Sequence, residues 1–358
     1  MNSVQWAFIW YYFVEGLLLI MVFRIALYNG DNDKQLPHFS QFIMFLLLLL
    51  IPFYFASEPV MDQSDKWNYE KSFLLFKEVD ISDMTIVDLG YIFYLYLLTK
   101  IISSPFVFFL ITAFLYLWGY FLFIKKTISP EFRLIFFLAA ISALGFYNYG
   151  TNTIRAGAAL SVILIAVSRK NFWFSTIPLL ILAVLIHKTM LLPATVFIGI
   201  HFFNSRTNFF YIWIICFLIS LVGGGAISNA LGSFFNFADN RVDYYLGEER
   251  FVYKTGFRID FIIYSLAPVL LAFYYKKKGF EDDFYNHILS TYIVCNSFWL
   301  LMIRMPFTDR LASLSWLFIP FLALYPLFNT KLVEKQNYWV AGILFVLSGI
   351  SFYLNVLR

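Results

Sequence analysis

Residues 105–124 read PFVFFLITAFLYLWGYFLFI, and the next two residues are Lys125 and Lys126. The run carries no charged residue, and about 20 apolar residues in a helix suffice to cross the hydrocarbon core of a bilayer. A lysine pair directly after such a run is typical of the cytoplasmic end of a spanning helix. This segment therefore predicts an α-helical integral membrane protein and gives it an orientation.

The composition of the whole chain agrees with this interpretation. Of its 358 residues, 61% are hydrophobic and 13% are charged, whereas soluble domains carry about 25% charged residues. This balance excludes a soluble enzyme. The formal charge of +4 does not indicate nucleic-acid binding, because most Lys and Arg residues stand at the ends of apolar runs, where membrane topology accounts for them. Cys216 and Cys295 lie within apolar runs and cannot form a disulfide framework.

Apolar runs of spanning length recur along the chain and predict an all-α, polytopic membrane protein with about 12 transmembrane helices in a single domain, 1–358. The first run lacks a basic start and a small-residue cleavage site, so it is expected to stay as an anchor. The predicted spans are 6–28, 40–57, 105–124, 132–149, 154–168, 172–187, 189–203, 208–226, 259–275, 285–303, 310–328 and 338–357.

Lysine and arginine crowd alternate short loops, which places those loops in the cytoplasm. The opposite face then holds both termini and two larger loops, 58–104 and 225–258. The stretch 88–101, DLGYIFYLYLLTKI, is interpreted as a juxtamembrane helix on the outer surface, because counting it as a span would put Lys125 and Lys126 on the wrong side. The cations that set this topology are Lys125, Lys126, Arg133, Arg169, Lys170, Arg206, Lys276, Lys277, Lys278, Lys331 and Lys335.

Several charged residues stand at span ends on the predicted outer side, against the positive-inside tendency. For any single one of these residues, an equally good explanation of its position is that the long side chain places its charge among the lipid headgroups. As a group they favour an anionic, lipid-linked substrate, because arginine binds phosphate through two parallel hydrogen bonds. The residues are Arg155, Lys188, Arg304 and Arg310, with Asp309 beside the last.

Three residues are candidates for accepting a proton. An imidazole exchanges protons near neutral pH, which makes His187 the first candidate, although a lone interfacial histidine is also commonly structural. Asp62 and Asp65 of the first external loop are the second choice, and their spacing also permits a hard cation. No spacing of His, Cys and Asp predicts a dedicated metal site, and we expect no metal and no cofactor.

Four short motifs and a looser fifth element carry a family resemblance. They are DQSDKWNY at 62–69, DLGY at 88–91, NTIRAGAA at 152–159, LIHKTM at 185–190, and Arg304 with Asp309 and Arg310. Their order resembles that of the Wzy/EpsG-like bacterial O-antigen and exopolysaccharide polymerases. Ala156 stands where the family usually has Gln, and Thr189 where it usually has Ser.

The resemblance implies a GT-C-like helical bundle in the bacterial inner membrane, with a catalytic pocket open to the periplasm. The implied reaction joins two undecaprenyl-diphosphate-linked oligosaccharides and releases lipid diphosphate. In this scheme the four cations bind diphosphate, and His187, Asp62 or Asp65 takes the proton, with Tyr69 and Asp309 nearby. The implied partners are the lipid-linked oligosaccharide, the bilayer and a chain-length regulator.

Other functions stay open from the sequence. A flippase or exporter of lipid-linked oligosaccharide would also need cations, although many transporters bind substrate near the bilayer midplane. Another GT-C glycosyltransferase or a ligase would favour paired acids in the first external loop, and Asp62 with Asp65 fits that pattern. A membrane acyltransferase is less favoured, because its histidine is expected deep in a channel.

Overall fold

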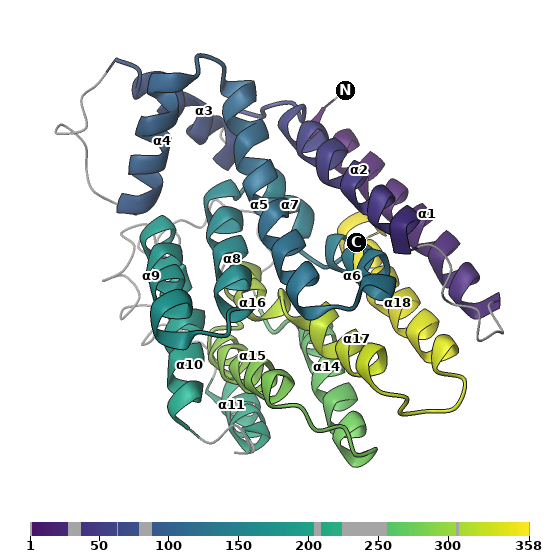
Figure 1. The fold of residues 1–358 in the computed structure, drawn as a ribbon. Coiled ribbons are helices and arrows are strands. Elements are labelled where there is room, and N and C mark those ends of the chain that lie inside the picture. Colours follow the sequence, from purple (N-terminus) through teal and green to yellow (C-terminus); the bar gives the residue numbers. More distant parts are fainter. Residues whose placement is uncertain are drawn as a thin grey trace. The chain divides into compact units, whose positions relative to one another are not determined.

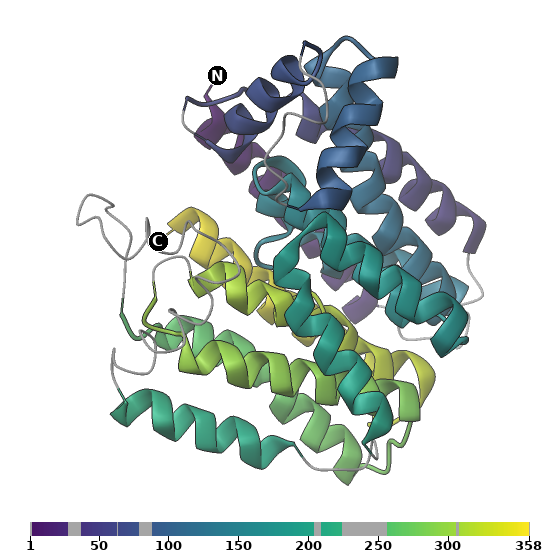
Figure 2. The ribbon, with the colours of Figure 1, turned by 90° about the vertical axis from the view of Figure 1, so that its left-hand side faces the viewer.

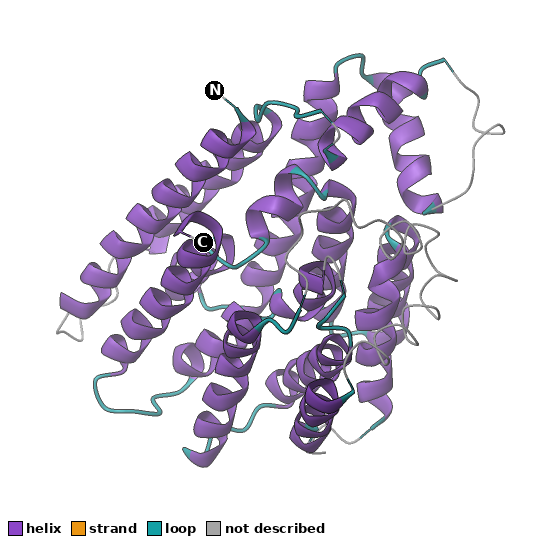
Figure 3. Ribbon diagram, turned by 180° about the vertical axis from the view of Figure 1, so that it is seen from behind, coloured by secondary structure: helices purple, strands orange, loops and turns teal. Residues whose placement is uncertain are grey.

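The computed structural model describes residues 2–27, 37–62, 64–78, 88–203, 209–223, 256–305 and 308–357. Throughout these ranges the regular structure is helical and there is no β-strand (Figure 3). The prediction of an all-α protein is therefore confirmed. Most of the predicted second external loop, 225–258, and part of the first lie outside the described residues.

The chain forms two compact units, residues 1–190 with 327–358 and residues 191–326 (Figure 1). The first unit holds α1 (Ser3–Leu27), α2 (Pro37–Ala56), α3 (Asp65–Leu75), α4 (Leu89–Ile101), α5 (Pro105–Thr127), α6 (Arg133–Ile141), α7 (Phe146–Thr151), α8 (Ile154–Val167), α9 (Ile177–Ile186) and α18 (Gln336–Phe352). The second holds α10 (Leu191–Phe202), α11 (Phe210–Val222), α14 (Ile259–Lys277), α15 (Asp283–Leu301), α16 (Thr308–Trp316) and most of α17 (Ile319–Asn329).

Where the structure describes them, the predicted spans are helical over most of their length, and two of them are interrupted there. The span 132–149 divides into α6 and α7 at Gly145, whose φ of +87° is a left-handed conformation that glycine adopts without strain. The span 310–328 divides before α17, where Pro320 has no N–H to continue the hydrogen bonds of α16.

Among the described residues, five helical stretches are long and apolar enough to cross a membrane on their own: Ser3–Leu27, Pro105–Thr127, Ile259–Lys277, Thr308–Asn329 and Gln336–Leu357. Shorter apolar helices fill much of the remaining predicted spans. The chain thus has the make-up of a multi-pass membrane protein, while the number of twelve spans stays a prediction.

The first unit is built around α5, which packs against α2 and α8. The helices α8 and α9, teal in Figures 1 and 2, lie side by side. The other main contact joins α1 to α18, where Ser348 Oγ donates a hydrogen bond to Glu15 Oε1 at 3.2 Å. Glu15 lies in the middle of the predicted span 6–28. The sequence does not reveal the partner of its carboxylate, because Ser348 lies near the other end of the chain.

The second unit is held by a buried polar network around Asn296 of α15. The side-chain amide donates to Ser265 Oγ of α14 at 3.2 Å and to Ser315 Oγ of α16 at 3.0 Å. Its oxygen accepts a hydrogen bond from Trp213 Nε1 of α11 at 2.8 Å. A fully bonded buried amide specifies one arrangement of the four helices, because any other would leave polar groups unsatisfied.

Two helices follow α2 in the predicted first external loop. The helix α3 is not evident from hydropathy; Ser64 caps it, with its Oγ accepting a hydrogen bond from Trp67 N at 3.1 Å. The helix α4 coincides with the predicted juxtamembrane helix and packs against α3 and α9. It leaves Phe93 and Ile101 exposed, a pattern that suits a helix lying on a membrane surface.

Candidate functional site

Asp88 joins three segments that are distant in the sequence. It is 6% exposed and precedes α4. Its Oδ2 lies 2.8 Å from the Arg155 Nη1 atom at the start of α8, and its Oδ1 accepts a hydrogen bond from the Lys188 backbone N–H at 3.0 Å. The carboxylate therefore ties α4 and α8 to the turn after α9, and it holds the guanidinium of Arg155 in one orientation.

A glycine makes this junction possible. A Cβ atom on Gly90 would lie 3.0–3.1 Å from the backbone and Cβ of Leu185 in the last turn of α9. Because Gly90 has no side chain, the first turn of α4 approaches α9 closely enough for Asp88 to reach the Lys188 N–H. The backbone of Asp88 is itself left-handed, with φ of +57°, a conformation that aspartate tolerates better than most residues.

Two tyrosine rings pack beside Arg155, one against the guanidinium and the other against the first ring. The guanidinium carbon lies 5.7 Å from the centre of the Tyr91 ring, within the range of a cation–π interaction. The Tyr69 ring of α3 meets Tyr91 edge-on, with centroids 5.7 Å apart. Tyr69, one of the residues selected from the sequence, is therefore connected to Arg155 through Tyr91.

A buried ion pair fixes the start of α3. Lys66 is 3% exposed; its Nζ donates hydrogen bonds to the carbonyls of Phe55 at 3.0 Å and Glu58 at 2.8 Å, and lies 3.7 Å from Glu58 Oε2. The Glu58 carboxylate also accepts hydrogen bonds from Ser3 Oγ at 2.6 Å and Tyr147 Oη at 3.0 Å. Burial lowers the pKa of Lys66 from 10.5 to about 8, and the nearby Glu58 charge offsets part of that effect.

This ion pair leads directly to the Arg155 segment. The backbone N–H of Lys66 donates to Asn152 Oδ1 at 3.3 Å, and Asn152 stands in the turn between α7 and α8. One hydrogen-bonded chain thus connects Glu58, the base of α3 and the start of α8. We infer that the helix α3 and Arg155 are positioned together.

The predicted proton acceptors lie in different surroundings. His187 is partly exposed at the end of α9, and its Nδ1 is 3.4 Å from Thr189 N and 3.3 Å from Thr189 Oγ1. Asp62 is exposed in the turn before α3, and Asp65 is the first residue of that helix and half-buried. Of the three, His187 belongs to the turn that also supplies the Lys188 N–H to Asp88.

The other predicted cations belong to the second unit. Arg304 is half-buried, and its guanidinium carbon lies 5.4 Å from the Phe257 ring centre. Asp309 and Arg310 are in the first turn of α16 and are also half-buried. The segment is anchored by Thr308, whose Oγ1 accepts from Trp299 Nε1 at 2.9 Å.

Four residues of this region were not selected from the sequence: Glu58, Lys66, Asp88 and Tyr91. The signal for Asp88 and Tyr91 was present in the DLGY motif, a charged residue directly before an apolar helix with a glycine close behind. Glu58 and Lys66 gave no comparable signal, because charges in a polar loop are normally solvated.

The model of the EpsG family matches residues 42–358. The chain belongs to the EpsG family. The resemblance predicted from the motifs is thereby confirmed, and membership of the EpsG family indicates a polymerase-like role in exopolysaccharide or O-antigen synthesis. No curated protein and no solved structure matches the chain. In the described part of this EpsG-family protein, no three His, Cys, Asp or Glu side chains gather as a metal site.

Proposed function

We propose that this EpsG-family protein is a polysaccharide polymerase of the inner membrane. It joins undecaprenyl-diphosphate-linked oligosaccharide repeat units at the periplasmic face by glycosyl transfer. A hydroxyl oxygen of the acceptor glycan forms a bond to the anomeric carbon of the donor. The bond from that carbon to the diphosphate oxygen breaks, and lipid diphosphate leaves with the electron pair.

The observation that carries this proposal is the Asp88–Arg155 pair. A guanidinium has five N–H donors, and Asp88 engages the Nη1 side of Arg155 while the side chain stays 14% exposed. Because the arginine is already oriented, it can bind an incoming diphosphate without first being ordered. Charge that grows on the leaving diphosphate is stabilised most by cations fixed in place beforehand.

The acceptor hydroxyl must also lose its proton. We assign this step to His187, with Asp62 and Asp65 as the alternatives. If Nδ1–H of His187 donates to Thr189 Oγ1, Nε2 holds the lone pair and can accept the proton from the sugar hydroxyl. The nearby Thr189 N–H, 3.4 Å from Nδ1, favours the opposite tautomer. The Thr189 hydroxyl can donate to Nδ1 or accept from it, so it is compatible with both tautomers, and the proposal requires the one in which it accepts.

The remaining predicted residues complete the proposal. From the sequence, Lys188, Arg304 and Arg310 are assigned to binding the anionic part of the substrate, and Asp309 and Tyr69 to positioning their neighbours. With cations in this role, the reaction needs no divalent metal. The second candidate function is an exporter of lipid-linked oligosaccharide, favoured by the same cations; another GT-C glycosyltransferase or a ligase is favoured by Asp62 and Asp65.

Purified protein in liposomes separates these functions. The liposomes carry an undecaprenyl-diphosphate-linked repeat unit, and the products are separated by size while the leaflet of the lipid is followed. A ladder of multiples supports a polymerase. Unchanged repeat units that move between leaflets would identify an exporter instead.

A further inference from the structure

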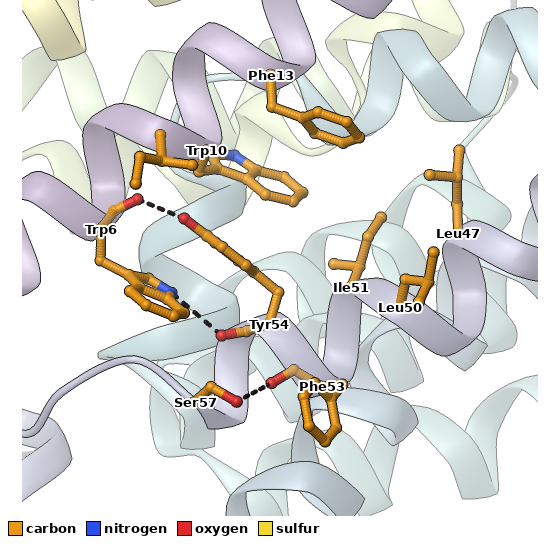
Figure 4. Close-up of a pocket in the computed structure, with 10 residues that line it drawn as sticks. Trp6, Trp10, Phe13, Leu47, Leu50, Ile51, Phe53, Tyr54 and Ser57 are labelled. Atoms are coloured by element: carbon orange, nitrogen blue, oxygen red, sulfur yellow. Dashed lines mark hydrogen bonds between the residues drawn. The ribbon is translucent and has the colours of Figure 1, made fainter.

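An apolar groove of about 380 Å³ lies between α1 and α2 in the first unit (Figure 4). Its floor is made by Trp10, Leu47 and Ile51, which are 2%, 7% and 3% exposed. Its rim includes Leu50 and Phe53, which are 61% and 57% exposed. Buried floor residues and exposed rim residues make this a trough open on one side, and we call it the α1–α2 groove.

The groove exists because the two helices have their main partners elsewhere. The helix α1 packs chiefly on α18, and α2 packs chiefly on α5. At one end, Trp6 and Tyr54 hold the helices together: Trp6 Nε1 donates to the Tyr54 carbonyl at 3.2 Å, and Tyr54 Oη donates to the Trp6 carbonyl at 2.6 Å (Figure 4). These bonds use the polar groups of both side chains, so they leave an apolar surface towards the groove.

The surroundings specify a hydrocarbon occupant. Water needs two to four polar partners to be stable in a cavity, and this lining offers almost none. From the residues that line it, the groove follows about 10 Å of α1 (Trp6 to Phe13) and about 15 Å of α2 (Leu47 to Ser57), at 1.5 Å per residue. These dimensions suit a segment of an extended lipid chain.

One end of the groove adjoins the candidate site. Ser57 lines that end, and the next residue is Glu58, whose carbonyl accepts the hydrogen bond from Lys66. The backbone of Lys66 in turn binds Asn152, just before the Arg155 helix. A chain lying in the groove would therefore carry its headgroup towards the external helix α3 and the cations beyond it.

We propose that the α1–α2 groove binds the polyprenyl chain of the lipid-diphosphate-linked substrate. This inference rests on the proposed function, since it assigns the hydrocarbon part of the same substrate. The α1 wall, from Trp6 to Phe13, precedes residue 42, where the family match begins. The α2 wall, from Leu47 to Ser57, lies within the family match, so the match contains one of the two walls of the groove.

The test uses a photoreactive polyprenyl diphosphate without sugar, added to the purified full-length protein in nanodiscs. Labelled peptides are mapped by mass spectrometry. The decisive variant is Leu50→Trp, which puts bulk into the groove from its exposed rim. The matched control is Leu49→Trp, an exposed neighbour on α2 that does not line the groove. A phospholipid with the same photoreactive group in its acyl chain serves as the comparison probe.

We expect labelling within 6–13 and 47–57. Leu50→Trp lowers it about tenfold, because displacing about two methylenes from the groove costs that much affinity, and Leu49→Trp leaves it unchanged. Equal labelling in both variants, labelling elsewhere, or a phospholipid signal that unlabelled polyprenyl diphosphate does not displace would overturn the proposal. Because labelling needs no turnover, a protein that binds the probe in the groove but makes no polymer would contradict the proposed function alone.

Discussion

The carboxylate of Asp88 accepts a hydrogen bond from the backbone of Lys188, 100 residues further along the chain, while its other oxygen lies 2.8 Å from Arg155. A single buried side chain therefore sets both the direction of a guanidinium and the position of the turn that carries His187. This relationship makes Asp88 the residue on which the geometry of the candidate site depends most.

The first prediction separates charge from shape at Arg155. Arg155→Lys keeps the positive charge but loses the planar fork that binds phosphate through two bonds. A charge-assisted contact contributes about 1.5–3 kcal/mol, so we expect polymer formation to fall roughly 10- to 100-fold. Arg169→Lys, an exposed arginine between α8 and α9, is the control and should keep full activity. Normal chain lengths from Arg155→Lys would show that the arginine has only a structural role, as the partner of Asp88.

The second prediction concerns the two roles of Asp88. Asp88→Asn removes the negative charge but keeps an oxygen for the Lys188 N–H, and asparagine tolerates the left-handed backbone. We expect it to lower stability by about 1.5–3 kcal/mol through loss of the charged contact. Asp88→Ala also loses the acceptor and adds strain of about 1 kcal/mol at positive φ. Thermal unfolding in detergent should rank wild type above Asp88→Asn and Asp88→Ala last; equal midpoints for all three would contradict the structural role.

The third prediction identifies the proton acceptor. His187→Ala should lower the rate about 10²–10⁴-fold, the usual contribution of a positioned base, whereas Asp62→Asn should have little effect because Asp62 is exposed. Thr189→Val removes the hydroxyl that accepts from Nδ1 in the proposed tautomer, and we expect a roughly 2- to 10-fold loss of rate that Thr189→Ser restores. A fully active His187→Ala variant would assign the proton transfer to Asp62 or Asp65.

The fourth prediction concerns Lys66 and pH. The folded pKa of about 8 lies below the ordinary value of 10.5, so the unfolded chain binds more protons between these values. Stability therefore rises with pH in this window, because a neutral lysine is less costly to bury, and the cost is fully present below pH 8. Glu58 and Glu70 are the acidic groups that favour the charged form.

Lys66→Met provides the comparison, since it has no titrating group at this position. Relative to Lys66→Met, wild type should gain up to about 3 kcal/mol between pH 8 and 10.5, at about 1.4 kcal/mol per pH unit. Thermal midpoints of the two proteins, measured across this range, test the expectation. A difference between them that does not change with pH would mean that Lys66 keeps its ordinary pKa in the folded protein.

Hydropathy predicts the helices well because lipid requires long apolar runs whose backbone bonds are satisfied internally. Hydropathy does not reveal the break at Gly145, because the turn there interrupts the helix without replacing any apolar residue by a polar one. It does not reveal α3 either, because the sequence of that helix, DKWNYEKSFLL, is polar. The motif comparison singled out the segments that carry Asp88, Arg155 and Lys188, but it did not show that the carboxylate of Asp88 joins the other two. Which charged residues meet depends on how distant helices pack, and the sequence pattern within one segment carries no such information.

The most direct test of the proposed function counts lipid diphosphate released by the purified protein against glycosidic bonds formed. The substrate is an undecaprenyl-diphosphate-linked repeat unit in detergent, and the reaction is run with and without EDTA. We expect a ladder of multiples, one lipid diphosphate released per new bond, and no effect of EDTA. Repeat units that stay single, with no lipid diphosphate released under either condition, would contradict the proposed function.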